Sequence, residues 1–302
     1  MDRQNVERRI RGQRRAGNGL PRRHVDRWVE VNGIRIRYLD SDASPEPAAL
    51  TGGGVLLMVH GWSGSAEDFR LLFGLLPPDR RAIAVDLPGS GLSAKPDAPY
   101  DLEFFVTFLR SFCNALGLDR FVLVGHSMGG QFAAHFVSRW PRAVERLILV
   151  APLGLRGEEG FWLKVARQGG IVNFAFRLNT RLFIRLTLRM NVLYKTSPEK
   201  LRVVLESTAR SILGRESTRA LGRTTTRVIG RGHVEALLPR IRQETLVIWG
   251  NRDKVLAPRW AKTFMALLPN AGGEMVADAG HMPMVDKPEH TAALISDFVS
   301  RR

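Results

Sequence analysis

The sequence predicts an α/β protein whose core is a mostly parallel, doubly wound sheet with a helical cap inserted into it. Short apolar runs that suit strands buried on both faces alternate with segments of helical periodicity. Such alternation favours right-handed crossovers between parallel strands. It stops at Pro152 and resumes at Thr245. We therefore expect a core formed by residues 28–152 and 233–302, with a helical cap, or lid, formed by residues 153–232.

The first element of this core is a β-hairpin, because Trp28–Val31 and Arg35–Asp40 flank Asn32-Gly33, a strong two-residue turn signal. Each later element is expected from a run of buried apolar residues or from apolar residues at helical spacing. In chain order these are a strand at Val55–Val59, a helix at Ser65–Leu76, a strand at Arg81–Val85, a helix at Asp101–Leu116, a strand at Phe121–Val124, a helix at Gln131–Trp140, strands at Leu147–Val150 and Thr245–Trp249, a helix at Pro258–Leu268, a strand at Gly273–Val276 and a helix at Glu289–Val299.

The stretch Phe121–Gly130 carries the main functional signal, a Gly-x-Ser-x-Gly motif between an expected buried strand and an expected helix. A serine on so sharp a strand-to-helix turn, a nucleophile elbow, projects its hydroxyl from the edge of the sheet. Gly125 and Gly129 fit places where the backbone passes too close for side chains, and the helix N-terminus favours developing negative charge. These features indicate that Ser127 is a nucleophile.

A base and an orienting acid are needed as well, because serine is a poor nucleophile near neutral pH. Asp253 lies just past the C-terminal end of one expected strand, and His281 lies past the next. Catalytic groups of α/β sheets collect at that edge, and the order Ser, Asp, His is one in which such triads occur. Asp278 and Asp286 compete as the acid, but the position of Asp253 directly after a buried strand favours it.

The joint occurrence of five motifs resembles the α/β-hydrolase superfamily, in its lidded esterase, lipase and carbon–carbon hydrolase branch. The resemblance covers residues 28–152 and 233–302. The motifs are His60-Gly61-Trp62, D86LPGSGLS, G125HSMGG, W249GNRDKV and G280HMPMVDKPE.

This resemblance implies a catalytic triad of Ser127, His281 and Asp253, and an oxyanion hole made by the backbone N–H groups of Trp62 and Met128. It implies no metal and no organic cofactor. An ester of apolar acyl or aryl character is the expected substrate, cleaved through an acyl-enzyme. Carbon–carbon hydrolysis of a ring-cleavage product is the nearest alternative, and a weakly catalytic ligand sensor or membrane-associated accessory protein is another. His60 and His126 are expected to brace backbone turns.

The net charge of +16 over 302 residues is unevenly placed. Residues 1–27 hold nine Arg against three acidic residues and are expected to form a disordered basic arm. Residues 153–232 hold sixteen Lys and Arg against five acidic residues. Nothing in the chain resembles a nucleic-acid module, so no nucleic-acid partner is expected. The single cysteine, Cys113, and the lack of an apolar leader favour a cytoplasmic location, with a peripheral membrane location as the alternative.

Arginines of the cap recur at intervals of four, which places neighbours close together on a helix. They form one row at Arg177, Arg181, Arg185 and Arg189 and another at Arg215, Arg219, Arg223, Arg227 and Arg231. Three hypotheses follow: the rows bind anionic lipid, receive an acidic substrate, or contact only solvent. Glycines and a threonine run at Thr224–Thr226 argue against a continuous helix in the second row. Candidates to line an apolar pocket are Phe161, Trp162, Phe174, Phe176, Phe183 and Leu186.

Overall fold

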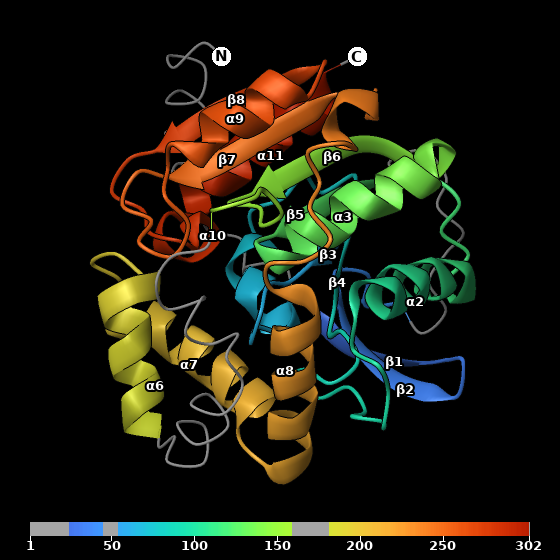
Figure 1. Ribbon diagram of the computed structural model, residues 1–302, viewed down its shortest axis with the longest axis vertical. Helices are drawn as coiled ribbons and strands as arrows, with labels where there is room; N and C mark the ends of the chain where they lie inside the picture. The colour runs from blue at the N-terminus through green and yellow to red at the C-terminus, as the bar shows by residue number, and fades with distance from the viewer. Residues whose placement is uncertain (1–23, 45–53, 159–180, 302) are drawn as a thin grey trace.

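The computed structural model describes residues 24–44, 54–158 and 181–301 (Figure 1). Its strands are β1 (Val25–Val31), β2 (Ile34–Asp40), β3 (Val55–Val59), β4 (Arg81–Val85), β5 (Phe121–His126), β6 (Val144–Val150), β7 (Thr245–Gly250) and β8 (Ala271–Val276). They form one sheet in the order β1-β2-β4-β3-β5-β6-β7-β8. Only the pairs β1–β2 and β2–β4 are antiparallel, and the other neighbours are parallel. The predicted fold class is therefore confirmed.

Both faces of this sheet are covered, so successive residues of a central strand enter different cores. In β3, Val55, Leu57 and Val59 belong to one hydrophobic cluster, whereas Leu56 and Met58 belong to the other. The first cluster is completed by α2 (Leu102–Ala115), α3 (Met128–Arg139) and α9 (Trp260–Leu267). The second is completed by η1 (Ala66–Leu72), α10 (Pro283–Asp286) and α11 (Pro288–Ser300). Short 3₁₀ turns, η2 (Pro141–Ala143) and η4 (Leu238–Arg240), precede β6 and β7.

The hairpin forms as predicted, with Asn32 and Gly33 at φ values of 51° and 74°, but it starts earlier than expected. β1 begins at Val25, so three residues assigned to the basic arm belong to the sheet. Every second residue of β1 from Val25 onward is half-buried or buried, a pattern that the surrounding arginines conceal in the sequence. Of the rest of the expected arm, residues 1–23 lie outside the described residues.

The segment expected to form the cap lies between β6 and β7, and its described residues, 181–232, are mainly helical. It contains α6 (Arg181–Thr187), a π-helical turn η3 (Leu188–Val192), α7 (Pro198–Ile212) and α8 (Arg215–Val228). These elements gather at the bottom of Figure 1, away from α9 and α11. None of the helices in the described part of the chain is both long and apolar enough to span a bilayer.

The expectation of a broken second Arg row is wrong from Arg215 to Arg227, because α8 is continuous from Arg215 to Val228. It is right at the end of the row, since the helix stops before Gly230, at φ 71°, and Arg231 lies beyond it. The hydroxyls of Thr224, Thr225 and Thr226 donate to carbonyls four residues earlier, at 3.0, 2.7 and 3.1 Å. The threonines thus bond within the helix and do not interrupt it.

Two further helix boundaries differ from expectation. The helix expected over Ser65–Leu76 is the 3₁₀ segment η1, which ends at Leu72. Its expected cap is present, since Ser65 Oγ accepts from the Glu67 N–H at 3.3 Å. The helix α3 begins at Met128, three residues before its expected start, because its first turn includes the glycines that follow Ser127.

Candidate active site

Ser127 lies on the turn between β5 and α3 in a backbone conformation that side chains rarely adopt, with φ 52° and ψ −118°. The turn is tight enough to require its glycines. A Cβ on Gly125 would lie 2.5 Å from the carbonyl oxygen of Gly129, and one on Gly129 would lie 2.6 Å from that of His60. The Gly-x-Ser-x-Gly spacing thus lets α3 pass over β5 and the end of β3 while presenting Ser127.

Three side chains that are distant in sequence form one chain of hydrogen bonds at this turn. His281 Nε2 lies 3.0 Å from Ser127 Oγ, and His281 Nδ1 lies 2.8 Å from Asp253 Oδ2. Asp253 follows β7 and His281 follows β8, so adjacent parallel strands bring them together. All three are buried, with 8%, 6% and 5% exposure for Ser127, Asp253 and His281. This geometry suits a serine whose proton passes to a histidine.

The second oxygen of Asp253 fixes the orientation of the carboxylate. Asp253 Oδ1 accepts from the backbone N–H groups of Val255 and Leu256 at 2.8 and 3.0 Å. Of the two competing acids, Asp278 is exposed, and its hydrogen bond with Asn251 is through its backbone N–H. Of these three acids, only Asp253 forms a hydrogen bond with the imidazole of His281.

Asp286, the other competitor, joins the loop that carries His281 to the cap. Asp286 Oδ2 accepts from the backbone N–H groups of Gly280 and Tyr194 at 2.8 and 3.0 Å. Thr196 donates to its other oxygen. The N–H of His281 itself donates to the carbonyl of Val192 at 2.8 Å. This double attachment was not predicted, although Asp286 belongs to the same motif as His281.

Two buried histidines flank the site and brace its backbone. His60 Nδ1 donates to the carbonyl of Gly61 at 2.8 Å, and its Nε2 accepts from the N–H of Leu87 at 3.1 Å. His126 Nε2 donates to the carbonyl of His281 at 3.0 Å. Burial lowers the pKa of both, and the proximity of His281 lowers that of His126 further. A neutral His126 places no positive charge beside the imidazole of His281.

The turn after β3 passes directly beside Ser127, since a Cβ on Gly61 would lie 2.9 Å from Ser127 Cβ. Trp62 follows in this turn, and Met128 begins α3, where the first N–H groups have no partner within the helix. The indole Nε1 of Trp62 donates to Thr225 Oγ1 of α8 at 2.8 Å. This side-chain contact between the turn and the cap was not predicted.

A polar cluster lies behind the same turn, where η1 meets α7. Ser207 Oγ donates to Asp68 Oδ1 and also lies within hydrogen-bond distance of Ser65 Oγ, both at 2.7 Å. Ser211 Oγ donates to the carbonyl of Gly64 at 2.7 Å. Burial raises the pKa of Asp68 to about 7, despite the hydrogen bond from Ser207. The cluster holds α7 against the backbone that leads away from Trp62.

Of the six residues expected to line an apolar pocket, only Leu186 has a described side chain, and its position does not support this role. Leu186 is 49% exposed on α6, so its side chain faces solvent. The positions Phe161, Trp162, Phe174 and Phe176 lie outside the described residues, as does the side chain of Phe183.

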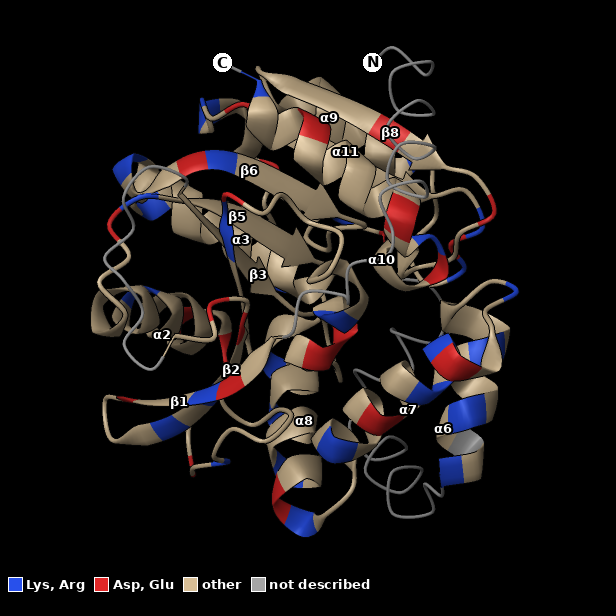
Figure 2. Cartoon of the chain, turned by 180° about the vertical axis from the view of Figure 1, so that it is seen from behind, with Lys and Arg blue, Asp and Glu red and all other residues tan. Residues whose placement is uncertain are grey.

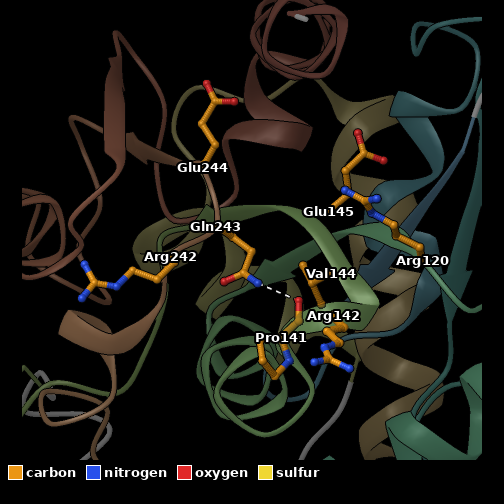
Figure 3. Close-up of a pocket in the computed structure, with 8 residues that line it drawn as sticks. All are labelled: Arg120, Pro141, Arg142, Val144, Glu145, Arg242, Gln243 and Glu244. Atoms are coloured by element: carbon orange, nitrogen blue, oxygen red, sulfur yellow. Dashed lines mark hydrogen bonds between the residues drawn. The ribbon is translucent and has the colours of Figure 1, made fainter.

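An open cavity of about 480 Å³ lies away from this site (Figure 3). Its lining residues precede or begin β5, β6 and β7, and they include Arg120, Arg142 and Arg242. Gln243 closes part of its wall by donating to the carbonyl of Pro141 at 2.7 Å. Ser127 follows β5, so the cavity is at the opposite edge of the sheet and contains no nucleophile. Among the described residues, no cluster of three or more His, Cys, Asp or Glu side chains is placed to hold a metal.

A mostly parallel sheet with a serine elbow after a central strand is the architecture of a hydrolase. The chain belongs to the α/β-hydrolase family, because the model of the alpha/beta hydrolase fold matches residues 54–288. This confirms the resemblance seen in the motifs. The relatives and structural neighbours include esterases, lipases and meta-cleavage product hydrolases.

The individual relatives have low sequence identity to this chain, but the similarity extends over most of its length. A 2-hydroxy-6-oxo-6-(2'-aminophenyl)hexa-2,4-dienoic acid hydrolase of Metapseudomonas resinovorans is 26% identical over 295 residues, covering 92% of each chain. A membrane phospholipase A described as a bacterial virulence factor is 26% identical with a TM-score of 0.73, covering 98% of this chain and 93% of that one. A thermophilic esterase from Thermogutta terrifontis is 22% identical with a TM-score of 0.75, covering 92% and 98%, and shows the shared fold alone.

Proposed function

We propose that this hydrolase cleaves a carboxylic ester through an acyl-enzyme formed on Ser127. The observation that carries the proposal is the continuous hydrogen-bond chain from Ser127 Oγ through both nitrogens of His281 to Asp253. Because Asp253 can only accept, His281 Nδ1 carries a proton, which leaves Nε2 as the base toward Ser127.

In the first half-reaction, Ser127 Oγ attacks the ester carbonyl as its proton passes to His281 Nε2. Asp253 stabilises the imidazolium and keeps its orientation without taking the proton. The tetrahedral oxyanion is held by the backbone N–H groups of Trp62, in the turn after β3, and of Met128, at the N-terminus of α3. His281 then protonates the leaving alcohol, and the acyl group remains on Ser127. Stabilising the oxyanion is expected to contribute most to the rate.

In the second half-reaction, water replaces the alcohol. His281 Nε2 takes a proton from the attacking water, a second tetrahedral oxyanion forms in the same place, and Ser127 leaves as its oxygen is reprotonated. No residue beyond the triad and the two backbone donors is needed for these steps.

The substrate class that we propose is an ester of apolar acyl or aryl character, with an anionic membrane surface as a partner of the cap. The likeness to a membrane phospholipase A across nearly the whole chain supports both parts. The location that follows is peripheral to a membrane.

A second candidate is carbon–carbon bond hydrolysis of a ring-cleavage product. It is favoured by the relative from Metapseudomonas resinovorans, whose name gives a substituted 2-hydroxy-6-oxo-hexadienoic acid as its substrate and which matches 92% of each chain. The same serine, histidine and oxyanion donors would serve, so the substrate distinguishes the two candidates.

The test is labelling with a fluorophosphonate, followed by a panel of substrates. We expect the probe to form an adduct on Ser127, mapped by mass spectrometry, and to leave Ser127→Ala unlabelled. We then expect turnover of p-nitrophenyl esters to exceed turnover of a 2-hydroxy-6-oxo-hexadienoate. The reverse preference would replace the ester proposal by the carbon–carbon one. An unlabelled wild-type protein that turns over neither substrate would favour a ligand sensor.

A further inference from the structure

The outer face of α6 and η3 is apolar although it is exposed. Leu182, Leu186 and Met190 are 64%, 49% and 64% exposed. They are three of the six large apolar side chains that are exposed among the described residues, and the other three are scattered over β1, β8 and the loop after β4. Exposed apolar residues that gather on one element, unlike single ones, indicate a surface that contacts something.

The same face is basic. Arg181, Arg185 and Arg189 alternate with the apolar residues and are all exposed. No acidic side chain among the described residues forms an ion pair with any of the three. Figure 2 shows Lys and Arg on successive turns of α6 at the outer edge of the molecule. The name α6 face is used below for these six exposed residues, Arg181, Leu182, Arg185, Leu186, Arg189 and Met190.

The second Arg row, of which Arg215 to Arg227 lie on α8, differs because part of it forms contacts inside the protein. Arg223 pairs with Asp97 and donates to the carbonyl of Ala98 at 2.9 Å. Arg227 donates to the carbonyl of Pro99 at 2.8 Å. These arginines attach the cap to the loop before α2. The two rows therefore have different roles, although the sequence spaces them alike.

The α6 face is joined directly to the candidate active site. The carbonyl of Val192, the last residue of η3, accepts from the N–H of His281 at 2.8 Å. Lys254, the residue after Asp253, donates from Nζ to the carbonyl of Met190 at 3.1 Å. The element that carries the α6 face thus contacts both loops that supply the base and its acid.

We propose that the α6 face docks on the surface of an anionic phospholipid bilayer, and so holds the candidate active site against the membrane. Alternating arginines and large apolar side chains, without acidic partners, complement a surface of phosphate groups over acyl chains. This inference rests on the proposed function only for its consequence, the delivery of an apolar ester from the bilayer.

The test is cosedimentation of the full chain with vesicles of phosphatidylcholine, with and without phosphatidylglycerol. We expect binding to the anionic vesicles only, weakened as salt rises. Each arginine near such a surface contributes about 1 kcal/mol, so Arg181→Glu/Arg185→Glu/Arg189→Glu should weaken binding at least about 100-fold. Leu182→Ser/Leu186→Ser/Met190→Ser should weaken it about 10-fold or more.

The matched control is Arg142→Glu/Arg240→Glu/Arg242→Glu, which changes the net charge equally at the opposite edge of the sheet. It should lose much less binding than the α6 charge variant. Equal losses would overturn the proposal, because binding would then follow net charge alone. A wild-type dimer that the apolar variant converts to monomer would also overturn it, in favour of a second copy of the chain.

Two measurements keep this test separate from that of the proposed function. All variants should retain the circular dichroism spectrum and the wild-type turnover of a short, soluble ester, since the substituted side chains are exposed. Ser127→Ala should bind vesicles like the wild type. Vesicle binding without esterase activity would contradict the proposed ester hydrolysis and leave the docking surface intact. Esterase activity without vesicle binding would contradict the docking surface and the membrane partner, and leave the ester hydrolysis intact.

Discussion

Several backbone hydrogen bonds hold Ser127 in its unusual conformation. Its N–H donates to the carbonyl of Val150 at 3.0 Å. Its own carbonyl accepts from Gly130, Gln131 and Leu153 at 2.9, 3.3 and 2.9 Å. A non-glycine residue at positive φ costs about 1–3 kcal/mol and persists only where the surroundings determine it. The side chain takes no part in these bonds, so it can be removed without releasing the turn.

The first prediction concerns the nucleophile and its base. Ser127→Ala and His281→Ala should each lower ester turnover by about 10⁴-fold or more, because both take part in the same proton transfer. Triad members act as a unit, so the double variant should be little slower than either single variant. Steady-state kinetics and melting temperatures measure this. Losses that multiply, or a Ser127→Ala protein with more than a few per cent of wild-type turnover, would contradict the assignment.

The second prediction separates the two buried acids. Asp253→Asn should lower turnover by about 10³-fold, because the amide no longer fixes the tautomer of His281. Asp286→Asn should lower turnover less than about tenfold but destabilise the protein by about 1–3 kcal/mol, since the amide replaces one of the two acceptor oxygens and leaves at least one donor of the His281 loop or the cap without an acceptor. Urea unfolding and kinetics of the same two variants measure both effects. A reversed pattern would make Asp286 the orienting acid.

At the scale of single residues, the sequence predicts the structure where one short motif determines the local backbone geometry. The glycines beside Ser127 are local consequences of one tight turn, so the motif predicts it. Asp253 and His281 follow from their positions after strands, because adjacent parallel strands end at one edge. The contact of Asp286 with Tyr194 joins residues 92 positions apart, and no local pattern encodes it.

Elements of the cap are fastened to the core through hydroxyl groups. The bond from the Trp62 indole to Thr225 Oγ1 joins α8 to the turn that carries a proposed oxyanion donor. Thr225→Val keeps the shape of the side chain but removes this bond, and should destabilise the protein by about 1–2 kcal/mol and slow ester turnover several-fold. Thr226→Val is the matched control, because its hydroxyl donates to carbonyls of Gly222 and Arg223 within α8. Equal effects of the two variants would show that helix propensity alone is responsible.

The stability of the contact between η1 and α7 should depend on pH through Asp68. Burial raises the pKa of this carboxyl group from 3.8 to about 7. Between these values the folded protein keeps a proton that the unfolded chain has released. The contribution of Asp68 to stability is therefore fully present below its ordinary pKa and is lost as the pH rises to about 7.

Asp68→Asn removes this dependence while keeping an acceptor for Ser207. Relative to the wild type, the variant should gain roughly 2–4 kcal/mol of stability between about pH 4.5 and about pH 8. Urea unfolding at both pH values measures the difference. A variant that follows the wild type at both values would mean that Asp68 is already ionised at the lower pH.

The sequence predicts individual helices in the core but none with defined bounds in the cap. The threonines of α8 have low intrinsic helix propensity, yet Thr224 and Thr225 are buried and bond to their own helix, so tertiary packing outweighs propensity. The sequence also does not predict that the apolar residues of α6 are exposed, since periodicity does not show which face of a cap helix meets the core.

At the scale of the whole molecule, the buried Arg37 connects the hairpin to the rest of the fold. It is 2% exposed and pairs with Glu67 of η1 at 2.6 Å and with Asp86, after β4, at 3.3 Å. Asp26 of β1 supplies a third carboxylate. Asp86 also accepts from the N–H of Ala66 at 2.7 Å. A buried cation is tolerated when it is paired in this way, and removing one partner is costly.

The extent of β1 leads to the last prediction, which concerns where the folded unit begins. Deleting residues 1–23 leaves the whole of β1 in place, so we expect this form to keep the stability and the soluble-ester turnover of the full chain. Deleting residues 1–27 removes Val25, Asp26 and Arg27 from β1, and with them the pairing of Arg27 Nε to Asp40 Oδ2 at 3.1 Å.

The longer deletion should destabilise the protein by about 2–4 kcal/mol, because it also takes a carboxylate from the buried Arg37. Urea unfolding of the three forms, with Asp26→Asn in the full chain to isolate the effect of the carboxylate, measures the loss. If the shorter deletion were destabilised as much as the longer one, residues before His24 would contribute to the fold. If both deletions matched the full chain, the first three residues of β1 would add no stability, and the folded unit would begin at Trp28.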